Sequence, residues 1–143
     1  EKERDRAEVL RYTSPIQPNK AASDQDFDRA LKVCAENIDC VGVCVGTHNE
    51  VSSLYMTELM AQHGITKDDP RVYFAQLLGM SDHISFNLAA EGYNVAKYVP
   101  YGPIREVVPY LIRRAEENTS VAGQTGRELQ LIQEERKRRK AKK

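Results

Sequence analysis

Three short apolar runs, each followed by a segment of helical spacing, constrain the fold of this chain more than any other feature. They occupy residues 40–46, 71–78 and 95–99 and are rich in β-branched and aromatic side chains. Continuous apolar runs of this length are typical of parallel strands that are covered on both faces. Strands that alternate regularly with helices form parallel sheets with right-handed crossovers. The sequence therefore predicts an α/β fold built on a parallel sheet.

Residues suited to helix ends predict where the helices begin and stop. Asn49 can cap the helix after the first strand, and Gly64 can end that helix in a left-handed conformation. Ser81 begins the next helix, and Gly92 ends it. Ahead of the first strand, the S-x-x-D pattern at residues 23–26 resembles a capping box and predicts a helix start. The apolar face of that helix is predicted to comprise Phe27, Ala30, Leu31 and Cys34.

The third strand and the helix after it lie between residues 95 and 118. We expect residues 95–99 to form a short buried strand, and Pro103 suits the first turn of the following helix, where no N–H is needed. Tyr98 then stands at the carboxyl end of its strand, which is the usual ligand side of an α/β barrel. Pro109 lies inside the helical pattern, where it predicts a kink or a displaced start. The apolar face of this helix is predicted to comprise Ile104, Val107, Val108, Leu111, Ile112 and Ala115.

Composition narrows the class of protein. The 143 residues suffice for one domain, and a formal net charge of zero gives no general attraction to nucleic acid. No apolar run approaches the roughly 18 residues of a membrane span, and no secretory signal is seen. An odd number of cysteines fits a reducing, cytoplasmic compartment, and we expect Cys34, Cys40 and Cys44 to be small buried hydrophobic residues. No histidine completes a set of metal ligands, so we expect no metal.

Three motifs occur in a specific order along the chain. The first is Thr-His-Asn at residues 47–49, and the second is a Gln/Leu-rich strand at residues 75–80 that ends in Gly-Met. The third is Tyr-x14-Arg-Arg-x-x-Glu-Asn, formed by Tyr98, Arg113, Arg114, Glu117 and Asn118. In order and spacing, the three motifs resemble the monofunctional type of the flavin-dependent proline dehydrogenase family over nearly the whole chain. An Arg-Arg pair alone would be far less specific, because on an exposed helix it usually marks a solvated face.

The resemblance implies that residues 1–126 form the C-terminal portion of a (βα)8 TIM-type barrel with parallel strands. Residues 127–143 would form a basic helical tail. A complete barrel takes about 250 residues, and the chain opens inside a charged helical segment without a cap, so we expect an incomplete catalytic domain. The other interpretation is a small α/β domain that is complete in itself. The family resemblance favours the barrel.

For activity, the resemblance implies oxidation of L-proline to pyrroline-5-carboxylate, with FAD as hydride acceptor and a quinone as electron sink. Arg113 and Arg114 would bind the substrate carboxylate, because a guanidinium fork matches a carboxylate and a lysine does not reproduce it. The two arginines lie about 100° apart around a helix, so only their long side chains could converge. Tyr98 is the expected catalytic residue, and Tyr98 and Leu77 would shape the pocket for the pyrrolidine ring.

Thr47, His48, Asn49 and Glu117 are the flavin contacts that the resemblance implies. Backbone amides at a helix start and a neutral imidazole can bind a phosphate, a ribose or adenine. Without the resemblance, Asn49 would only cap a helix and His48 would fill a loop. Glu117 lies one turn beyond Arg113, so an i,i+4 ion pair between them is the alternative to a flavin contact. The family pattern favours the flavin.

A second class of function stays open on the residues alone, namely a non-catalytic α/β fragment that binds an anionic partner or acts as an assembly module. Uncovered strand edges would favour self-association or pairing with the N-terminal half of a barrel. The basic cluster at residues 136–140 could meet an anionic lipid surface or nucleic acid, although such an end is more often a solvated helix. Because the family passes electrons to a membrane quinone, the resemblance allows peripheral contact with the inner membrane, which is mitochondrial in a eukaryote. We expect no nucleic-acid partner.

Overall fold

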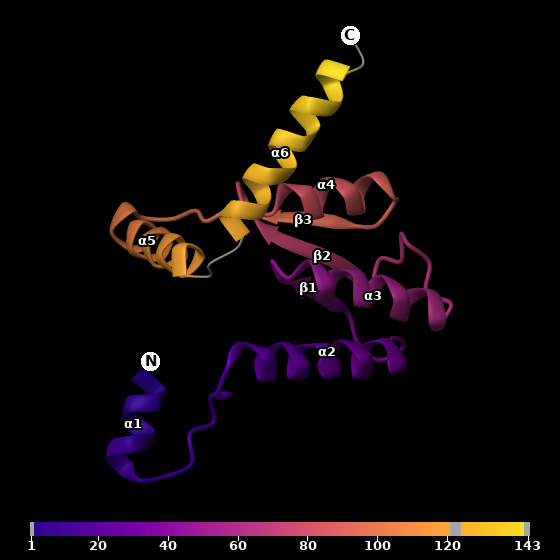
Figure 1. The fold of residues 1–143 in the computed structure, drawn as a ribbon. Helices are drawn as coiled ribbons and strands as arrows, with labels where there is room; N and C mark the ends of the chain where they lie inside the picture. Colours follow the sequence, from indigo (N-terminus) through magenta and orange to yellow (C-terminus); the bar gives the residue numbers. More distant parts are fainter. Residues whose placement is uncertain (1, 121–123, 142–143) are drawn as a thin grey trace.

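A computed structural model describes residues 2–120 and 124–141. The elements in these residues are α1 (Lys2–Leu10), α2 (Lys20–Glu36), β1 (Val43–Gly46), α3 (Glu50–Gln62), β2 (Val72–Leu77), α4 (Asp82–Ala90), β3 (Val95–Tyr98), α5 (Ile104–Ser120) and α6 (Gln124–Ala141). The strands form one parallel sheet in the order β1-β2-β3 (Figure 1). The predicted α/β fold with parallel strands is therefore confirmed.

The core lies between one face of the sheet and helices α2, α3 and α4. On that face Val45, Val72 and Phe74 are each 1% exposed or less. The helices complete the cluster with Leu31, Ala35, Met56, Leu59, Met60, Ile84 and Leu88. Burial of apolar surface contributes roughly 25 cal/mol per Å², so this cluster holds the strands and the starts of the following helices in place.

The opposite face of the sheet is largely exposed. Tyr73 is 43% exposed and Tyr98 is 56% exposed, and burial alternates along β1. The expectation that the strands are covered on both faces, with residues 95–99 buried, is therefore wrong for this chain. An apolar run shows that a strand can be covered on both faces, but β3 is an edge strand here and the helices described above pack on the other side. The expectation that the three cysteines are buried is also wrong, because Cys44 lies on the exposed face, Cys40 is exposed in the turn before β1, and Cys34 is only half-buried on α2.

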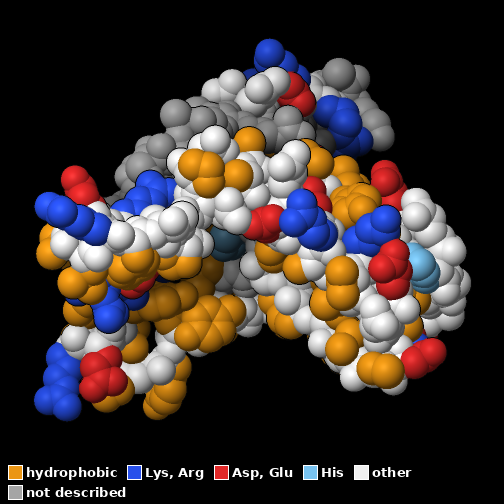
Figure 2. Space-filling model, turned by 90° about the horizontal axis from the view of Figure 1, so that it is seen from below, with side chains coloured by type: hydrophobic (Ala, Val, Ile, Leu, Met, Phe, Trp, Pro, Cys, Tyr) orange, Lys and Arg blue, Asp and Glu red, His pale blue; other side chains and the backbone are white. Residues whose placement is uncertain are grey.

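Helix α5 lies beyond the carboxyl edge of the sheet (Figure 1). It begins directly after Pro103, as predicted, and runs through Pro109. Among the described side chains of its predicted apolar face, Val107 is half-buried and the others are exposed, with Ile104 at 80% and Ile112 at 53%. Figure 2 shows hydrophobic side chains gathered on the side of α1 and α5, around a hollow between that side and the part formed by α2, α3 and α4. The molecule therefore presents apolar surface on both the sheet and α5.

The predicted ends of α3 and α4 agree with the structure. Asn49 Oδ1 accepts a hydrogen bond from the Val51 N–H at 3.0 Å, which caps α3. Gly64, at φ +67°, follows the end of α3, and Gly92, at φ +91°, follows the end of α4. Both glycines adopt the left-handed conformation that ends helices at low cost.

The predicted start of α2 is wrong. The helix begins directly after Asn19, whose side chain accepts a hydrogen bond from the Ala22 N–H at 2.9 Å, and residues 23–26 lie inside the helix. Asparagine is as good a cap as serine, so the sequence offered two starts and the earlier one is used. One residue of the predicted apolar face also differs, since Ala30 is exposed and Ala35 is buried in its place.

Helix α6 forms the end of the described chain and carries Arg138, Arg139 and Lys140 in its last turn. It projects away from the sheet in Figure 1. Within residues 2–120 and 124–141, no helix is both long enough and apolar enough to cross a membrane. The division into a barrel part and a basic tail after residue 126 stays a prediction.

Candidate functional site

The carboxyl edge of the sheet brings together the loops that follow the strands. β1 ends at Gly46, β2 at Leu77 and β3 at Tyr98, and each loop leads into a helix (Figure 1). In folds with parallel strands, ligands bind outside this edge. Every residue predicted for the site lies on one of these loops, at a strand end, or on α5.

The loop of Thr47, His48 and Asn49 joins β1 to α3 and is held by several hydrogen bonds. The Asn49 N–H donates to Thr47 Oγ1 at 3.0 Å, while the Asn49 side chain caps α3. His48 Nδ1 lies 2.9 Å from Ser81 Oγ, just before α4. The loop therefore places fixed polar groups beside the amino end of α3, where the helix dipole favours an anion.

Gln76 ties this loop to the sheet and was not among the predicted site residues. Its side chain is 2% exposed, its Nε2 donates to the Thr47 carbonyl at 3.2 Å, and its Oε1 accepts from Ser85 Oγ at 2.8 Å. A buried amide needs such partners, since an unpaired one is costly. The sequence signal that could have indicated this role is the presence of a glutamine within an otherwise apolar strand.

Leu77 and Tyr98 are register partners on β2 and β3, so they occupy the same face of the sheet. Leu77 is 8% exposed and Tyr98 is 56% exposed. The structure thus places the two residues that were predicted to contact the pyrrolidine ring side by side at the carboxyl edge.

Arg113 and Arg114 both approach the ring of Tyr110 on α5. Their guanidinium carbons lie 5.9 and 5.5 Å from the ring centroid, and the Tyr110 ring meets the Tyr98 ring edge to face, with centroids 6.2 Å apart. The sequence predicted Tyr98 and the two arginines as neighbours but missed Tyr110, which joins them. The side chain of Glu117 lies outside the described residues, so its flavin contact stays a prediction.

The described residues offer no metal site. Within residues 2–120 and 124–141, no group of three or more histidine, cysteine, aspartate or glutamate side chains could hold a metal ion.

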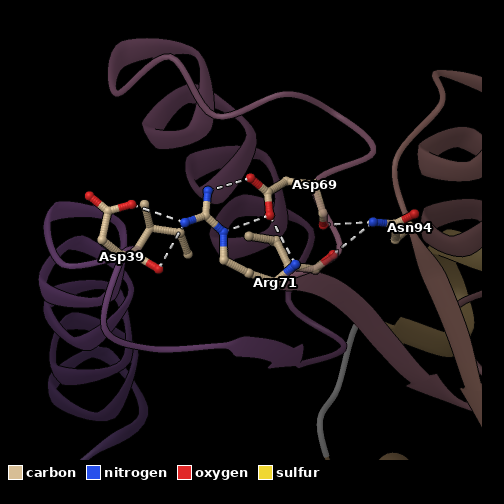
Figure 3. Close-up of polar contacts among 6 residues, drawn as sticks. Asp39, Asp69, Arg71 and Asn94 are labelled. Carbon is tan, nitrogen blue, oxygen red and sulfur yellow. Dashed lines mark hydrogen bonds and ion pairs between the residues drawn. The ribbon is translucent and has the colours of Figure 1, made fainter.

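An ion-pair cluster joins the elements at the opposite, amino edge of the sheet (Figure 3). Arg71 donates from Nε and Nη2 to the Asp69 carboxylate at 2.9 and 2.7 Å, and from Nη1 to Asp39 at 3.0 Å. Asn94 Nδ2 donates to the Asp69 carbonyl at 2.8 Å. Hydrogen bonds from the side chain and then the backbone of Arg71 lower the pKa of Asp69 from 3.8 to about 2. The cluster lies away from the predicted site, and we interpret it as stabilising the fold.

Comparison with known proteins identifies the family. The sequence model of the proline dehydrogenase family matches residues 1–127. This chain belongs to the proline dehydrogenase family. The match confirms the resemblance seen in the three sequence motifs.

Curated relatives of this family member are much longer than the chain. It is 45% identical over 133 residues to "Proline dehydrogenase 1, mitochondrial" of Homo sapiens, a match that covers 91% of this chain and 22% of that protein. It is 40% identical over 149 residues to the protein of the same name in Drosophila melanogaster, covering 97% and 22%. It is 42% identical over 143 residues to "Hydroxyproline dehydrogenase" of Bos taurus, covering 97% and 31%. The chain thus spans between a fifth and a third of these relatives.

A solved structure agrees with the family and the fold. The chain superposes on proline utilization A from Bdellovibrio bacteriovorus, inactivated by N-propargylglycine, with a TM-score of 0.77 and 29% identity. The match covers 85% of this chain and 12% of that one. The predicted fold class, part of a TIM-type barrel with parallel strands, is therefore confirmed.

Proposed function

We propose that this chain forms part of the active site of an enzyme that oxidises L-proline to pyrroline-5-carboxylate in proline catabolism, with FAD as hydride acceptor and a quinone as electron sink. Membership of the proline dehydrogenase family supports this proposal. The observation that carries it is the approach of both Arg113 and Arg114 to Tyr110, next to Tyr98, at the carboxyl edge of the sheet.

The substrate carboxylate binds to Arg113 and Arg114 in this proposal. Each guanidinium offers a planar fork of donors that matches two carboxylate oxygens. The two guanidinium carbons lie 5.9 and 5.5 Å from the centre of the Tyr110 ring, and we propose that these neighbouring residues of α5 act on one anion. Leu77 and Tyr98 then form the wall against the pyrrolidine ring, since they share one face of adjacent strands.

Oxidation removes a hydride from the ring carbon beside the nitrogen and a proton from the nitrogen, which leaves a C=N bond. The nitrogen lone pair assists the loss of hydride, so the bound amine must be neutral. A wall of Leu77 and the Tyr98 ring disfavours the ammonium form, because apolar surroundings destabilise a charge. Tyr98 would therefore act on the reacting ring, and the arginines would act on the carboxylate alone.

The loop of Thr47, His48 and Asn49 fits a flavin dinucleotide. It combines the amides at the start of α3 with the hydroxyl of Thr47 and the imidazole of His48, which suit phosphate and ribose groups. Glu117, which follows the two arginines on α5, is the other residue proposed to contact the flavin. Bound FAD supplies the two-electron acceptor for the hydride.

The names of the relatives support a proposal for the substrate range and the location. Proteins named proline dehydrogenase and hydroxyproline dehydrogenase match at similar identity, 45% and 42% in the human and bovine cases, so both amino acids belong in the assay. The human and Drosophila relatives carry "mitochondrial" in their names, and we propose the same location for this enzyme, in peripheral contact with the inner membrane that holds the quinone.

An assembly module without catalysis is the second candidate function. The exposed face of the sheet and the exposed apolar face of α5 favour it, because both require a covering partner. Both candidate functions are compatible with pairing to another polypeptide that supplies further strands. Flavin content and turnover separate the two candidates.

The test uses a chimera in which these 143 residues replace the matching segment of human proline dehydrogenase 1. Arg113→Met and Arg114→Met should each lower kcat/KM for proline about tenfold to a few hundredfold, because a hydrogen bond to a charged group contributes roughly 1.5–3 kcal/mol. Lysine at either position should restore only part of the activity. His48→Ala should lower flavin content more than it raises KM for proline.

The matched control is Arg105→Met on the same helix. The Arg105 side chain is 86% exposed, so this variant should change neither kcat/KM for proline nor flavin content. Pyrrolidine, which lacks the carboxylate, measures discrimination between ligands. If both arginine variants still discriminate proline from pyrrolidine, the carboxylate assignment is wrong. A colourless chimera that reduces no dye with proline or hydroxyproline would favour the assembly module.

A further inference from the structure

Ser81 has an unusual backbone conformation at the carboxyl edge. It lies directly before α4 with φ 52° and ψ 41°, in the left-handed region, and is 5% exposed. A residue with a Cβ adopts this region at a cost that its surroundings must offset. Such outliers cluster at functional sites, and the contacts that maintain this one indicate its role.

Contacts on both sides of Ser81 hold it in this conformation. Its carbonyl accepts hydrogen bonds from the N–H groups of Ile84 at 3.0 Å and Ser85 at 3.2 Å in the first turn of α4. Lys97 reaches across from β3, and its Nζ donates to the Met80 carbonyl and to Asp82 Oδ1, each at 2.8 Å. Lys97 therefore donates hydrogen bonds to the residues immediately before and after Ser81.

Ser81 also contacts His48. Its Oγ lies 2.9 Å from His48 Nδ1, and so links the loop after β2 to the loop after β1. A partner at one ring nitrogen of a histidine sets the ring orientation and selects the tautomer. Because Lys97 belongs to β3, this chain of contacts connects the ends of all the strands in the sheet.

We propose that Ser81 is a positioning residue for His48, and that Lys97 holds Ser81 in the conformation this requires. The inference rests on the proposed function, in which His48 contacts the flavin. Lys97 directly precedes Tyr98, so the strand that presents the substrate residue also sets the geometry of the cofactor loop.

Nuclear magnetic resonance of the histidine rings tests the contact without any cofactor. The chain has three histidines, so selective ¹⁵N labelling with His48→Gln as a reference assigns the ring of His48. In the wild-type chain one tautomer should dominate. Ser81→Gly, which keeps the left-handed backbone and removes the hydroxyl, should give the tautomer mixture of free histidine. Lys97→Met should shift the mixture in the same direction, and Lys97→Arg should restore the wild-type signal in part.

Lys67→Met is the matched control. It removes an ion pair with Glu91, 3.0 Å long, at the amino edge of the sheet. This ion pair joins the segment before β2 to the segment before β3. This variant should leave the His48 signals unchanged. A Ser81→Gly chain with wild-type His48 signals would overturn the proposal, as would a Lys97→Met chain no different from the control.

Flavin affinity in the chimera tests the purpose of the contact. Ser81→Gly and Lys97→Met should each weaken flavin binding about tenfold, as the loss of an orienting partner does at histidine metal sites, with KM for proline nearly unchanged. If the His48 tautomer changes while flavin affinity stays at the parent value, the positioning role is wrong. If the parent chimera binds no flavin, the proposed function fails, and the resonance experiment still decides whether Ser81 orients His48.

Discussion

Tyr110 supports both arginines of the proposed carboxylate site, which makes its ring the most informative position on α5. The guanidinium carbons of Arg113 and Arg114 lie 5.9 and 5.5 Å from the ring centroid. A cation–π contact at an exposed site contributes about 0.5–1 kcal/mol, so the two contacts together contribute about 1–2 kcal/mol. Tyr110→Leu removes both, and should weaken binding of the substrate carboxylate by about fivefold to thirtyfold.

Tyr110→Phe is the matched variant, because it keeps the ring and removes only the hydroxyl. It should change proline binding by less than about twofold, since both cation–π contacts and the contact with Tyr98 remain. The assay is the dissociation constant of proline in the chimera, followed by the flavin absorbance, with pyrrolidine as the ligand without a carboxylate. If the phenylalanine variant binds proline as weakly as the leucine variant, the hydroxyl and not the cation–π contacts supports the arginines. If Tyr110→Leu weakens pyrrolidine binding as much as proline binding, Tyr110 does not act through the carboxylate.

The ion-pair cluster at the amino edge should make stability sensitive to acid. Because hydrogen bonds from Arg71 lower the pKa of Asp69 from 3.8 to about 2, its stabilising contribution is complete above pH 3.8 and is lost as the pH falls through 2. The urea midpoint of unfolding should drop in that window, and Asp69→Asn should flatten the drop, whereas Asp24→Asn, in an exposed ion pair with Lys20, should not. An unchanged acid slope in Asp69→Asn would contradict this interpretation. The exposed apolar face predicts self-association of the isolated chain, so size-exclusion chromatography should show an apparent mass that rises above 16.2 kDa with concentration, and Tyr73→Lys should reduce that rise. A monomer at every concentration, with a sharp unfolding transition, would count against an incomplete barrel.

The order of elements could be predicted because its signals are local. Hydrophobic runs and helical spacing depend on residues a few positions apart, and each observed strand lies within a predicted run. Asn49 and Gly64 act on the nearest turn of α3, so their roles are also visible in the sequence. The start of α2 could not be predicted in the same way, because Asn19 and Ser23 are comparable caps and no local signal selects between them.

What covers each face of the sheet could not be predicted in this way. An apolar strand indicates that covering both faces would be favourable, but the residues that do so come from other parts of a protein. Cys44 and Tyr73 illustrate this, because both are exposed on a face that no local pattern distinguishes from the buried one.

The residues of the candidate site also differ in whether a local sequence signal predicts them. Tyr98, Arg113 and Arg114 were predicted from a motif whose spacing lies within one strand–helix unit. Gln76 and Lys97 were missed because each acts on a loop that is remote in sequence, at the Thr47 and Met80 carbonyls respectively. Nothing in the composition of a strand shows which distant carbonyl its polar side chain will meet.

The parallel α/β pattern, the cap of α3, the glycines that follow α3 and α4, and the residues at the strand ends could all be predicted from the sequence, because periodicity and backbone preference act over a few residues. Only the folded chain shows that α5 lies beyond the carboxyl edge with the Tyr110 ring near both arginines, and that Ser81 adopts a left-handed conformation and contacts His48. A serine prefers other conformations when only its neighbours are considered. It is held here by a lysine from another strand, and that constraint exists only once the chain has folded.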